Sequence, residues 1–488
     1  MKRVFSSVLA ALILMAAPVA KAENITVDQA KNAAAHFMQH NSTLTRLTAD
    51  QLVLERQWEN DELGVPSMYL LVAQGQGWII ITATTVMDPV VGYSDDSDVN
   101  AACLPPQMEW WLEGFNEMVC ELQKSDAEKP LADSPRWTEL ANRQLTGTKA
   151  NVYLLNTKWN QGEPDGLEYN MMCPTINDTV CPTGCVATAM AQICKYYEYP
   201  IQPVGNKTYR YYYTVNGSTY SKLVHLFYED SAAFDYSLMP NKFSAPPSQA
   251  NYAQRLEVSR IGYYLGTSVE MQYAPDGSGS SSELVAPAMR DYFKYKTGSY
   301  ILRDQVGSST FLSRIRADLT NKYPVYMSGA SSTGSDAHSA GHAWVCDGIQ
   351  ESNETHYHMN WGWGGSGNGW FNLSENNMAI SGMSYNFNRR QGAVVGMTPP
   401  ADSLLAIRSV EIDASLGNAY PNPASVSVTL PYRLGQAAEL NVYSADGRLV
   451  ESRRLAAGRG EVTLSTEAYP AGIYVYRVGN AHGRFVVR

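Results

Sequence analysis

Basic residues are scarce in this sequence of 488 residues. It has 37 Lys and Arg against 47 Asp and Glu, which gives a formal net charge of -10 at pH 7. Proteins that bind nucleic acid or anionic membranes need a basic surface to neutralise phosphate groups. The charge balance therefore argues against both classes of partner. Solenoid-type repeats and low-complexity tracts are also missing, so we expect ordinary globular domains.

Long hydrophobic runs are missing after the first 22 residues. The chain starts with a basic "MKR", the apolar run "VFSSVLAALILMAAPVA" and the small-x-small triplet Ala20-Lys21-Ala22. This pattern predicts a secretory signal peptide over residues 1–22, whereas a membrane anchor would need a longer apolar run and a stop-transfer flank. We therefore expect an exported protein whose mature form has no membrane span.

Cysteine is infrequent and odd in number, with seven in the chain. In an exported protein an odd count leaves at least one thiol unpaired or paired with another molecule. The hydrophobic content of 44% is ordinary for a globular protein. At this length the chain is predicted to form about three folded units.

The segment 23–143 is predicted to be a small α+β domain. Thr26 and Gln29 form a capping box before a helical pattern, and "SMYLLVAQGQGWIIITAT" predicts two strands joined at 75–77. From about Ser125 to Lys149 the sequence is polar, contains several Lys and Arg, and has little apolar periodicity. This composition predicts an exposed linker that proteases can reach.

Two further units follow. Residues 144–400 mix helix and strand signals and contain most of the cysteine and histidine. Residues 401–488 alternate apolar and polar side chains, with hairpin signals at Asp446-Gly447 and Gly479-Asn480. The last unit is therefore predicted to be a small all-β sandwich.

Cys185 is the candidate nucleophile. It follows a Thr-Gly turn, and apolar residues then recur at helical spacing up to Pro200. A thiol in the first turn of a helix has its pKa lowered by the helix dipole, which favours the reactive thiolate. A packed core thiol is the alternative for a lone cysteine. The residues that accompany Cys185 decide between the two.

His342 is the best placed of eight histidines to act as the base. It stands where a Gly/Ser-rich loop enters a predicted strand, 342 - 185 = 157 residues after Cys185, close to the gap of about 130 to 150 known from papain-like enzymes. Asn360 and Trp361 follow and are candidates to orient its imidazole. Gln161 is a candidate donor to an oxyanion, with a surface glutamine as the alternative.

Three motifs in this order, "TGCVATAMAQ", "AGHAWVCDGI" and "HMNWGWGGSGNGWF", resemble the streptopain family of secreted bacterial cysteine peptidases. The N-terminal unit is similar to the inhibitory propeptide of that family. The resemblance implies an α+β, papain-like fold of two subdomains that works without a cofactor. It also implies that Cys185 is the nucleophile, His342 the base and acid, and Gln161 the oxyanion donor. Both Asn360 and Trp361 remain candidates to orient the histidine.

The same resemblance implies that Ser278 and Gly341 contact the backbone of the substrate. The chain departs from the family in having additional cysteines near the site. Cys173 and Cys181 are predicted to close a short disulfide loop beside the nucleophile. Cys194 and Cys346 are expected to be buried small residues.

A metal site is the rival interpretation for the histidines. His356 and His358 alternate on one predicted strand and so face the same side, which would suit zinc. No third ligand at metal spacing lies nearby in the sequence. We therefore expect no metal.

The tail has a resemblance of its own. "NAYPNPASVSVTL", "YPAGIYVYRV" and the ending "GRFVVR" resemble the C-terminal sorting domain of the type IX secretion system of Gram-negative bacteria. This implies delivery by that machinery to the medium or the outer cell surface. An ordinary carbohydrate-binding or adhesive β-module is the alternative.

Together these features predict a secreted cysteine endopeptidase made as a zymogen, whose partners are protein and peptide substrates and its own propeptide. Cleavage at Arg143 or Lys149 in the linker would activate it. A catalytically silent peptidase fold that serves as a surface adhesin is the alternative from another class. Another thiol acyl-transfer enzyme, such as an amidase, would use the same pair of residues.

Overall fold

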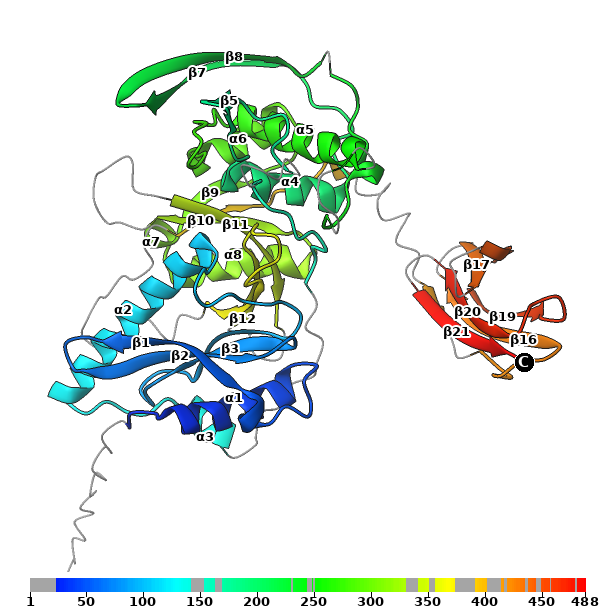
Figure 1. Ribbon diagram of the computed structural model, residues 1–488, viewed down its shortest axis with the longest axis horizontal. Coiled ribbons are helices and arrows are strands. Elements are labelled where there is room, and N and C mark those ends of the chain that lie inside the picture. The colour runs from blue at the N-terminus through cyan, green and yellow to red at the C-terminus, as the bar shows by residue number, and fades with distance from the viewer. Residues whose placement is uncertain are drawn as a thin grey trace, which may run out of the picture. The chain divides into compact units, whose positions relative to one another are not determined.

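The computed structural model describes residues 23–141, 153–162, 169–229, 231–243, 248, 251–330, 341–350, 356–373, 391–401, 414–416, 419–434, 438–444, 449–456, 458–478 and 481–488. The chain divides into two compact units, Met1–Thr398 and Pro399–Arg488 (Figure 1). The predicted signal peptide and the cleavage candidates Arg143 and Lys149 lie outside the described residues.

A ten-stranded sheet runs through the first unit. Its strands occur in the order β1-β2-β3-β4-β13-β12-β11-β10-β14-β9. They are β1 (Val53–Asn60), β2 (Val65–Ala73), β3 (Gly77–Thr82), β4 (Val90–Ser94), β9 (Ser299–Leu302), β10 (Val325–Ala330), β11 (Gly341–Ile349), β12 (His356–Asn360), β13 (Gly369–Asn372) and β14 (Gly392–Val395). All pairs in it are antiparallel.

The N-terminal strands join the central region through one short pairing. Trp370 and Phe371 of β13 stand opposite Tyr93 and Gly92 of β4. The predicted N-terminal domain therefore shares its sheet with the rest of the unit and does not form a separate compact body. The two strands predicted around Gly75-Gln76-Gly77 are present as β2 and β3.

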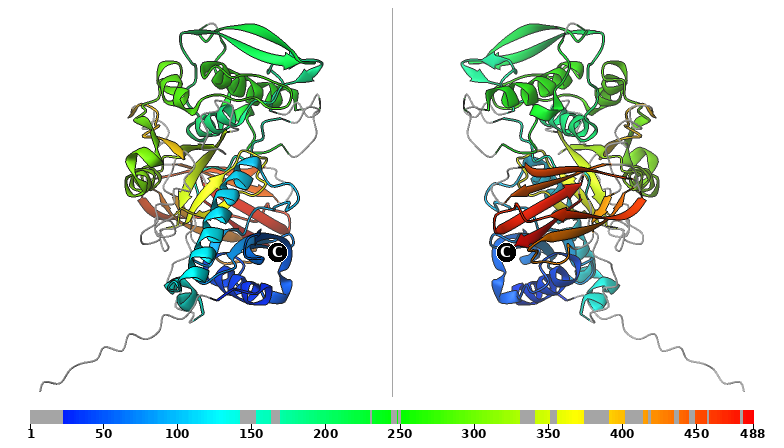
Figure 2. Two further views of the ribbon diagram at one scale, coloured as in Figure 1. Left: turned by 90° about the vertical axis from the view of Figure 1, so that its left-hand side faces the viewer. Right: turned by 90° about the vertical axis from the view of Figure 1, so that its right-hand side faces the viewer.

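Helices cover both faces of the N-terminal strands. Helix α1 (Val27–Asn41) begins at the predicted capping box of Thr26 and Gln29. It packs with α3 (Pro135–Ala141) against one face, while α2 (Pro106–Glu128) packs against the other. Figure 2 shows α2, in cyan, extending along the sheet, and it contacts both β2 and β11.

The expectation of an exposed linker from Ser125 is confirmed at residues 127–130 and 132–133 but is wrong for the parts of α2 and α3 that pack inward. Ser125 and Asp126 are buried near the end of α2, and a carboxylate oxygen of Asp126 accepts the Leu131 N–H at 2.7 Å. The Trp137 indole of α3 donates to the Met87 carbonyl at 2.8 Å. These contacts hold the segment against the domain. The sequence did not predict them, because the segment lacks apolar periodicity.

Helices make up most of the opposite end of the first unit (Figure 1). They are α4 (Cys185–Tyr197), α5 (Tyr252–Ser268), α6 (Val285–Asp291), α7 (Arg303–Val306) and α8 (Ser308–Thr320). Two hairpins accompany them, β5 (Thr175–Ile176) with β6 (Thr179–Val180) and β7 (Asn206–Val215) with β8 (Ser218–Phe227). The helix predicted from Cys185 is therefore present and ends before Pro200.

The second unit consists of two small antiparallel sheets around one apolar core, which confirms the predicted sandwich. One sheet has the order β15-β16-β19 and the other β18-β17-β20-β21. The strands are β15 (Ala414–Leu416), β16 (Ser427–Leu434), β17 (Ala438–Ser444), β18 (Leu449–Leu455), β19 (Gly458–Ser465), β20 (Gly472–Val478) and β21 (Ala481–Val487). The predicted turn residues 446–447 and 479–480 lie outside the described residues, and the strands flanking them pair as predicted.

Among the described helices of the whole chain, not one combines the length and the apolar character needed to cross a membrane.

Candidate active site

Cys185 is the first residue of α4. The preceding Gly184 has φ +88°, and a Cβ at this position would lie 2.7 Å from the Ser278 carbonyl oxygen and 2.9 Å from the Met271 side chain. Only glycine fits this turn, because both the backbone conformation and the close approach exclude a side chain. The turn thus places a partly buried cysteine at the amino end of the helix beside Ser278.

Backbone amides surround the sulfur of Cys185. The N–H groups of Ala343, Val186 and Cys185 itself hydrogen-bond it and favour the thiolate. Burial outweighs them, so the pKa of Cys185 is raised. The expected lowering of this pKa by the helix terminus is therefore wrong for this structure, because the desolvation of the thiolate is the larger effect.

His342 lies next to Ala343 in β11, where its backbone stands opposite Gly329 of β10. Burial lowers the pKa of His342. Side chains alternate between the faces of a strand, so His342 shares the face of Trp344, and Ala343 faces the other way. Burial thus disfavours the charged form of both groups, the thiolate and the imidazolium.

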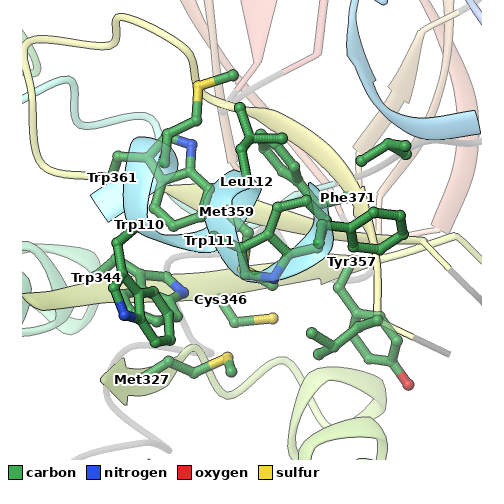
Figure 3. Close-up of a cluster of buried hydrophobic side chains, with 14 of the residues drawn as sticks. Trp110, Trp111, Leu112, Met327, Trp344, Cys346, Tyr357, Met359, Trp361 and Phe371 are labelled. Atoms are coloured by element: carbon green, nitrogen blue, oxygen red, sulfur yellow. The ribbon is translucent and has the colours of Figure 1, made fainter. Parts of the chain in front are cut away.

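The face of β11 that carries His342 is covered by α2. Trp110 of α2 lies 5.8 Å from Trp344 between ring centroids, and Trp344 lies 5.3 Å from Trp361. Figure 3 shows these three indoles within one buried cluster. A Cβ on Gly329 would lie 2.0 Å from the Trp110 ring. The N-terminal domain thus reaches the strand position directly opposite His342.

Gln161 lies in a segment without regular secondary structure that contacts the residues before α4. Its carbonyl oxygen accepts the Thr183 N–H at 2.7 Å, and its own N–H donates to the Asn160 side chain at 2.7 Å. Thr183 is two residues before Cys185, so this hydrogen bond holds the Gln161 backbone next to the turn that leads to Cys185. The structure therefore brings Gln161 and Cys185 into one neighbourhood.

The amide of Asn360 is tied to groups other than His342. It donates to the Thr157 carbonyl at 2.7 Å and accepts from Gln192 and from the Gly362 N–H, both at 3.2 Å. Sequence reasoning missed Gln192. Its spacing of seven residues from Cys185 shows only that the two residues share a face of α4, and it does not indicate the contact with Asn360.

Trp361 is fully buried between Trp344 and Phe371, and its indole N–H donates to the Gly367 carbonyl at 2.9 Å. Its ring thus packs within the buried cluster.

The two substrate-contact candidates lie in different segments, Ser278 beside the turn before Cys185 and Gly341 at the start of β11. Ser278 is 8% exposed, and its carbonyl lies over Gly184. Gly341 is exposed at the start of β11, opposite Ala330. Residues 331–340, which precede Gly341, lie outside the described residues.

The predicted disulfide between Cys173 and Cys181 is wrong, because both thiols are free. Cys181 stands opposite Pro174, to whose carbonyl it donates its N–H at 2.9 Å, so the cysteines are out of register. The Cys173 sulfur instead lies 3.8 Å from the Thr183 hydroxyl. Cys194 and Cys346 are buried, as predicted.

The two histidines of β12 are engaged in packing and hydrogen bonding. His356 packs against Phe37 and Tyr93. His358 stacks on Tyr153, and its Nδ1 lies 2.6 Å from a carboxylate oxygen of Asp347. Across the described residues, no three His, Cys, Asp or Glu side chains are grouped so as to hold a metal ion.

Three regions of the chain match known families. Residues 159–371 match the peptidase C10 family, residues 22–119 the Spi protease inhibitor, and residues 418–488 the secretion system C-terminal sorting domain. The first range contains Cys185, His342 and Gln161. The region that builds the candidate site is therefore of a peptidase class.

Two curated relatives extend this likeness beyond the site. The thiol protease/hemagglutinin PrtT of Porphyromonas gingivalis is 30% identical over 425 residues, which are 82% of this chain and 45% of that protein. Streptopain of Streptococcus pyogenes is 28% identical over 406 residues, which are 79% of this chain and 95% of that protein. The region of the candidate site, residues 159–371, thus matches the peptidase C10 family, in line with the predicted resemblance to streptopain.

A solved structure shares the fold. The prointerpain A fragment of Prevotella intermedia aligns with a TM-score of 0.54 at 24% identity, over 71% of this chain and 98% of that one. Together with the matched inhibitor domain, this confirms the predicted α+β, papain-like fold with an N-terminal α+β domain. The sorting domain confirms the predicted location outside the cell or at its surface.

Proposed function

We propose that the protein is a cysteine endopeptidase made as a zymogen. Cys185 attacks the peptide carbonyl, and His342 takes up the thiol proton and then protonates the leaving amine. Gln161 and the Cys185 backbone N–H hold the oxyanion, and water hydrolyses the acyl-enzyme. The observation that carries the proposal is the position of Cys185 at the amino end of α4, with its sulfur hydrogen-bonded by the neighbour of His342.

The latent state is supported by the faces of β11. His342 shares the face that α2 covers, whereas the thiol lies at the Ala343 backbone, and burial disfavours the charged form of both groups. We infer that Trp110, which lies over the strand position opposite His342, restrains the geometry of the pair in the zymogen. Removal of α2 with the N-terminal domain would free the strand position opposite His342. The proposed partners of the enzyme are its protein substrates and the secretion machinery that would recognise the C-terminal domain.

The test compares the purified full chain with its Cys185→Ala variant, in reductant at mildly acidic to neutral pH. We expect the wild-type chain to lose an N-terminal fragment that ends between Ala141 and Asn151 and then to digest casein, whereas Cys185→Ala stays whole. Intact mass and casein cleavage are the measurements. If both chains stay whole, trypsin is added to cut the chain between Ala141 and Asn151 in trans. Continued inactivity of the cut wild-type chain would favour the surface adhesin instead.

A further inference from the structure

Two buried side-chain amides join three distant segments beside the candidate site. Gln192 of α4 is 0% exposed and Asn360 at the end of β12 is 1% exposed. The Gln192 amide nitrogen donates to the Asn360 amide oxygen at 3.2 Å. The Gln192 oxygen accepts the Trp159 N–H at 3.4 Å, and the Asn360 nitrogen donates to the Thr157 carbonyl at 2.7 Å. We call these two residues the amide clamp.

The clamp holds the segment that leads to Gln161. Thr157, Trp159 and Gln161 lie at every second position of this segment, and each has a backbone polar group that is hydrogen-bonded. The first two are bound by the clamp, and the third accepts the Thr183 N–H at 2.7 Å. Consecutive anchors thus fix this segment relative to α4, which also carries Cys185.

The energetics favour a single arrangement of the clamp. A buried amide that loses a hydrogen-bond partner is strongly disfavoured, because water cannot replace the lost bond. The Asn360 oxygen is shared by Gln192 and the Gly362 N–H, so the Gly-rich loop after β12 is held by the same network. A shift of Gln192 would therefore move several connected groups together.

We propose that Gln192 and Asn360 are positioning residues that act through Gln161 and set the distance between the oxyanion donor and the Cys185 sulfur. This assigns Asn360 to the oxyanion side of the site rather than to the orientation of His342. The inference rests on the proposed function, because it presupposes that Cys185 is the nucleophile and Gln161 the oxyanion donor. Oxyanion stabilisation depends on donors within hydrogen-bond distance of the developing charge, so small displacements of Gln161 lower kcat.

The experiment is a double-mutant cycle on the activated enzyme with a peptide substrate. Gln192→Met keeps an unbranched side chain of similar length and removes both amide bonds. We expect it to lower kcat by about 10- to 100-fold with little change in KM, since about a 1 Å displacement has effects of this size. In a Gln161→Ala background, Gln192→Met is expected to cause no further loss. Thr188→Val, which changes a buried residue of the same helix whose hydroxyl has no hydrogen-bond partner among the described residues, is the matched control and should retain activity.

A second readout separates positioning from general damage to the site. Alkylation of Cys185 by iodoacetamide needs the thiolate but no oxyanion donor, so its pH profile should be the same in Gln192→Met and the wild type. An equal loss of kcat in both Gln161 backgrounds, or a shifted alkylation profile, would overturn the proposal, as would full activity of Gln161→Ala. If Gln192→Met does not fold, Gln192→Glu, which retains the acceptor for Trp159, enters the same cycle.

The proposed function has a separate point of failure. Equal hydrolysis by the wild type and Cys185→Ala would refute the nucleophile itself, whereas additivity in an active, Cys185-dependent enzyme refutes only the clamp.

Discussion

Trp110 of helix α2 lies on Gly329, the residue of β10 that stands directly opposite His342 in β11. A Cβ on Gly329 would lie 2.0 Å from the indole. The N-terminal domain therefore contacts β10, the neighbour of the strand that carries the candidate base, at a point where no side chain fits between them. This contact links the packing of the propeptide to the geometry of the site.

Gly329→Ala is expected to destabilise the full chain and to speed its self-processing. The added methyl group forces α2 away from β10, and overpacking of this kind costs about 1–3 kcal/mol. Thermal unfolding and the half-time of N-terminal cleavage measure the two effects. Gly472→Ala, where the nearest atom to an added Cβ lies 3.9 Å away, should behave like the wild type. Unchanged melting and processing of Gly329→Ala would show that α2 does not restrain this strand.

Acidification is expected to weaken the N-terminal domain through His356. Burial lowers the pKa of His356 from 6.5 to about 4. The hydrogen bond with the Val90 backbone raises this pKa by a smaller amount, and the positive charge of Arg136 lowers it by less still. Because the folded pKa is lowered, the stability that neutral His356 provides is present above pH 6.5 and is lost as the pH falls toward 4. A shift of this size corresponds to about 3 kcal/mol.

The measurement is the unfolding free energy of the full-length Cys185→Ala chain between pH 7 and pH 4. Since His356 packs against Phe37 and Tyr93 of the N-terminal domain, His356→Phe should flatten the pH dependence. The exposed His482 of the second unit supplies a control, and His482→Phe should leave the profile unchanged. A full acid response in His356→Phe would assign it to other groups.

The sequence was informative where structure is set locally and less so where distant residues meet. The turn at Gly184, the capping box at Thr26 and the alternation of the C-terminal strands are short-range patterns, and the structure follows each of them. The pairing of β4 with β13 joins strands far apart in the chain and has no turn signal. The Gln192–Asn360 hydrogen bond likewise joins two distant residues, and no pattern in the sequence shows that these two amides are buried together. The raised pKa of Cys185 reflects desolvation, which only the packed structure reveals.

All seven thiols are expected to react with Ellman's reagent when the chain is unfolded without reductant, since all seven are free in the structure. In the folded chain Cys103 should react first because it is exposed, whereas the buried Cys173 and Cys181 should be protected. The count of released thiolate in denaturant is the measurement, and a fully reduced sample calibrates it. A count of five before reduction would restore the Cys173–Cys181 bridge, provided that mass mapping locates it there.

Gly184→Ala is expected to lower peptidase activity far more than it lowers stability. At φ +88° an alanine is strained by about 1–3 kcal/mol, and its Cβ would lie 2.7 Å from the Ser278 carbonyl. Relief of this clash moves the start of α4, so Cys185 shifts relative to Gln161, and a displacement of about 1 Å lowers the rate by about 100-fold. Peptide hydrolysis by the activated enzyme and its thermal unfolding are measured together. Gly279→Ala is the control in the facing segment, next to Ser278, where an added Cβ meets nothing within 4 Å, and it should retain both properties. Equal activity of the two variants would mean that the turn before Cys185 tolerates a side chain and does not fix the nucleophile.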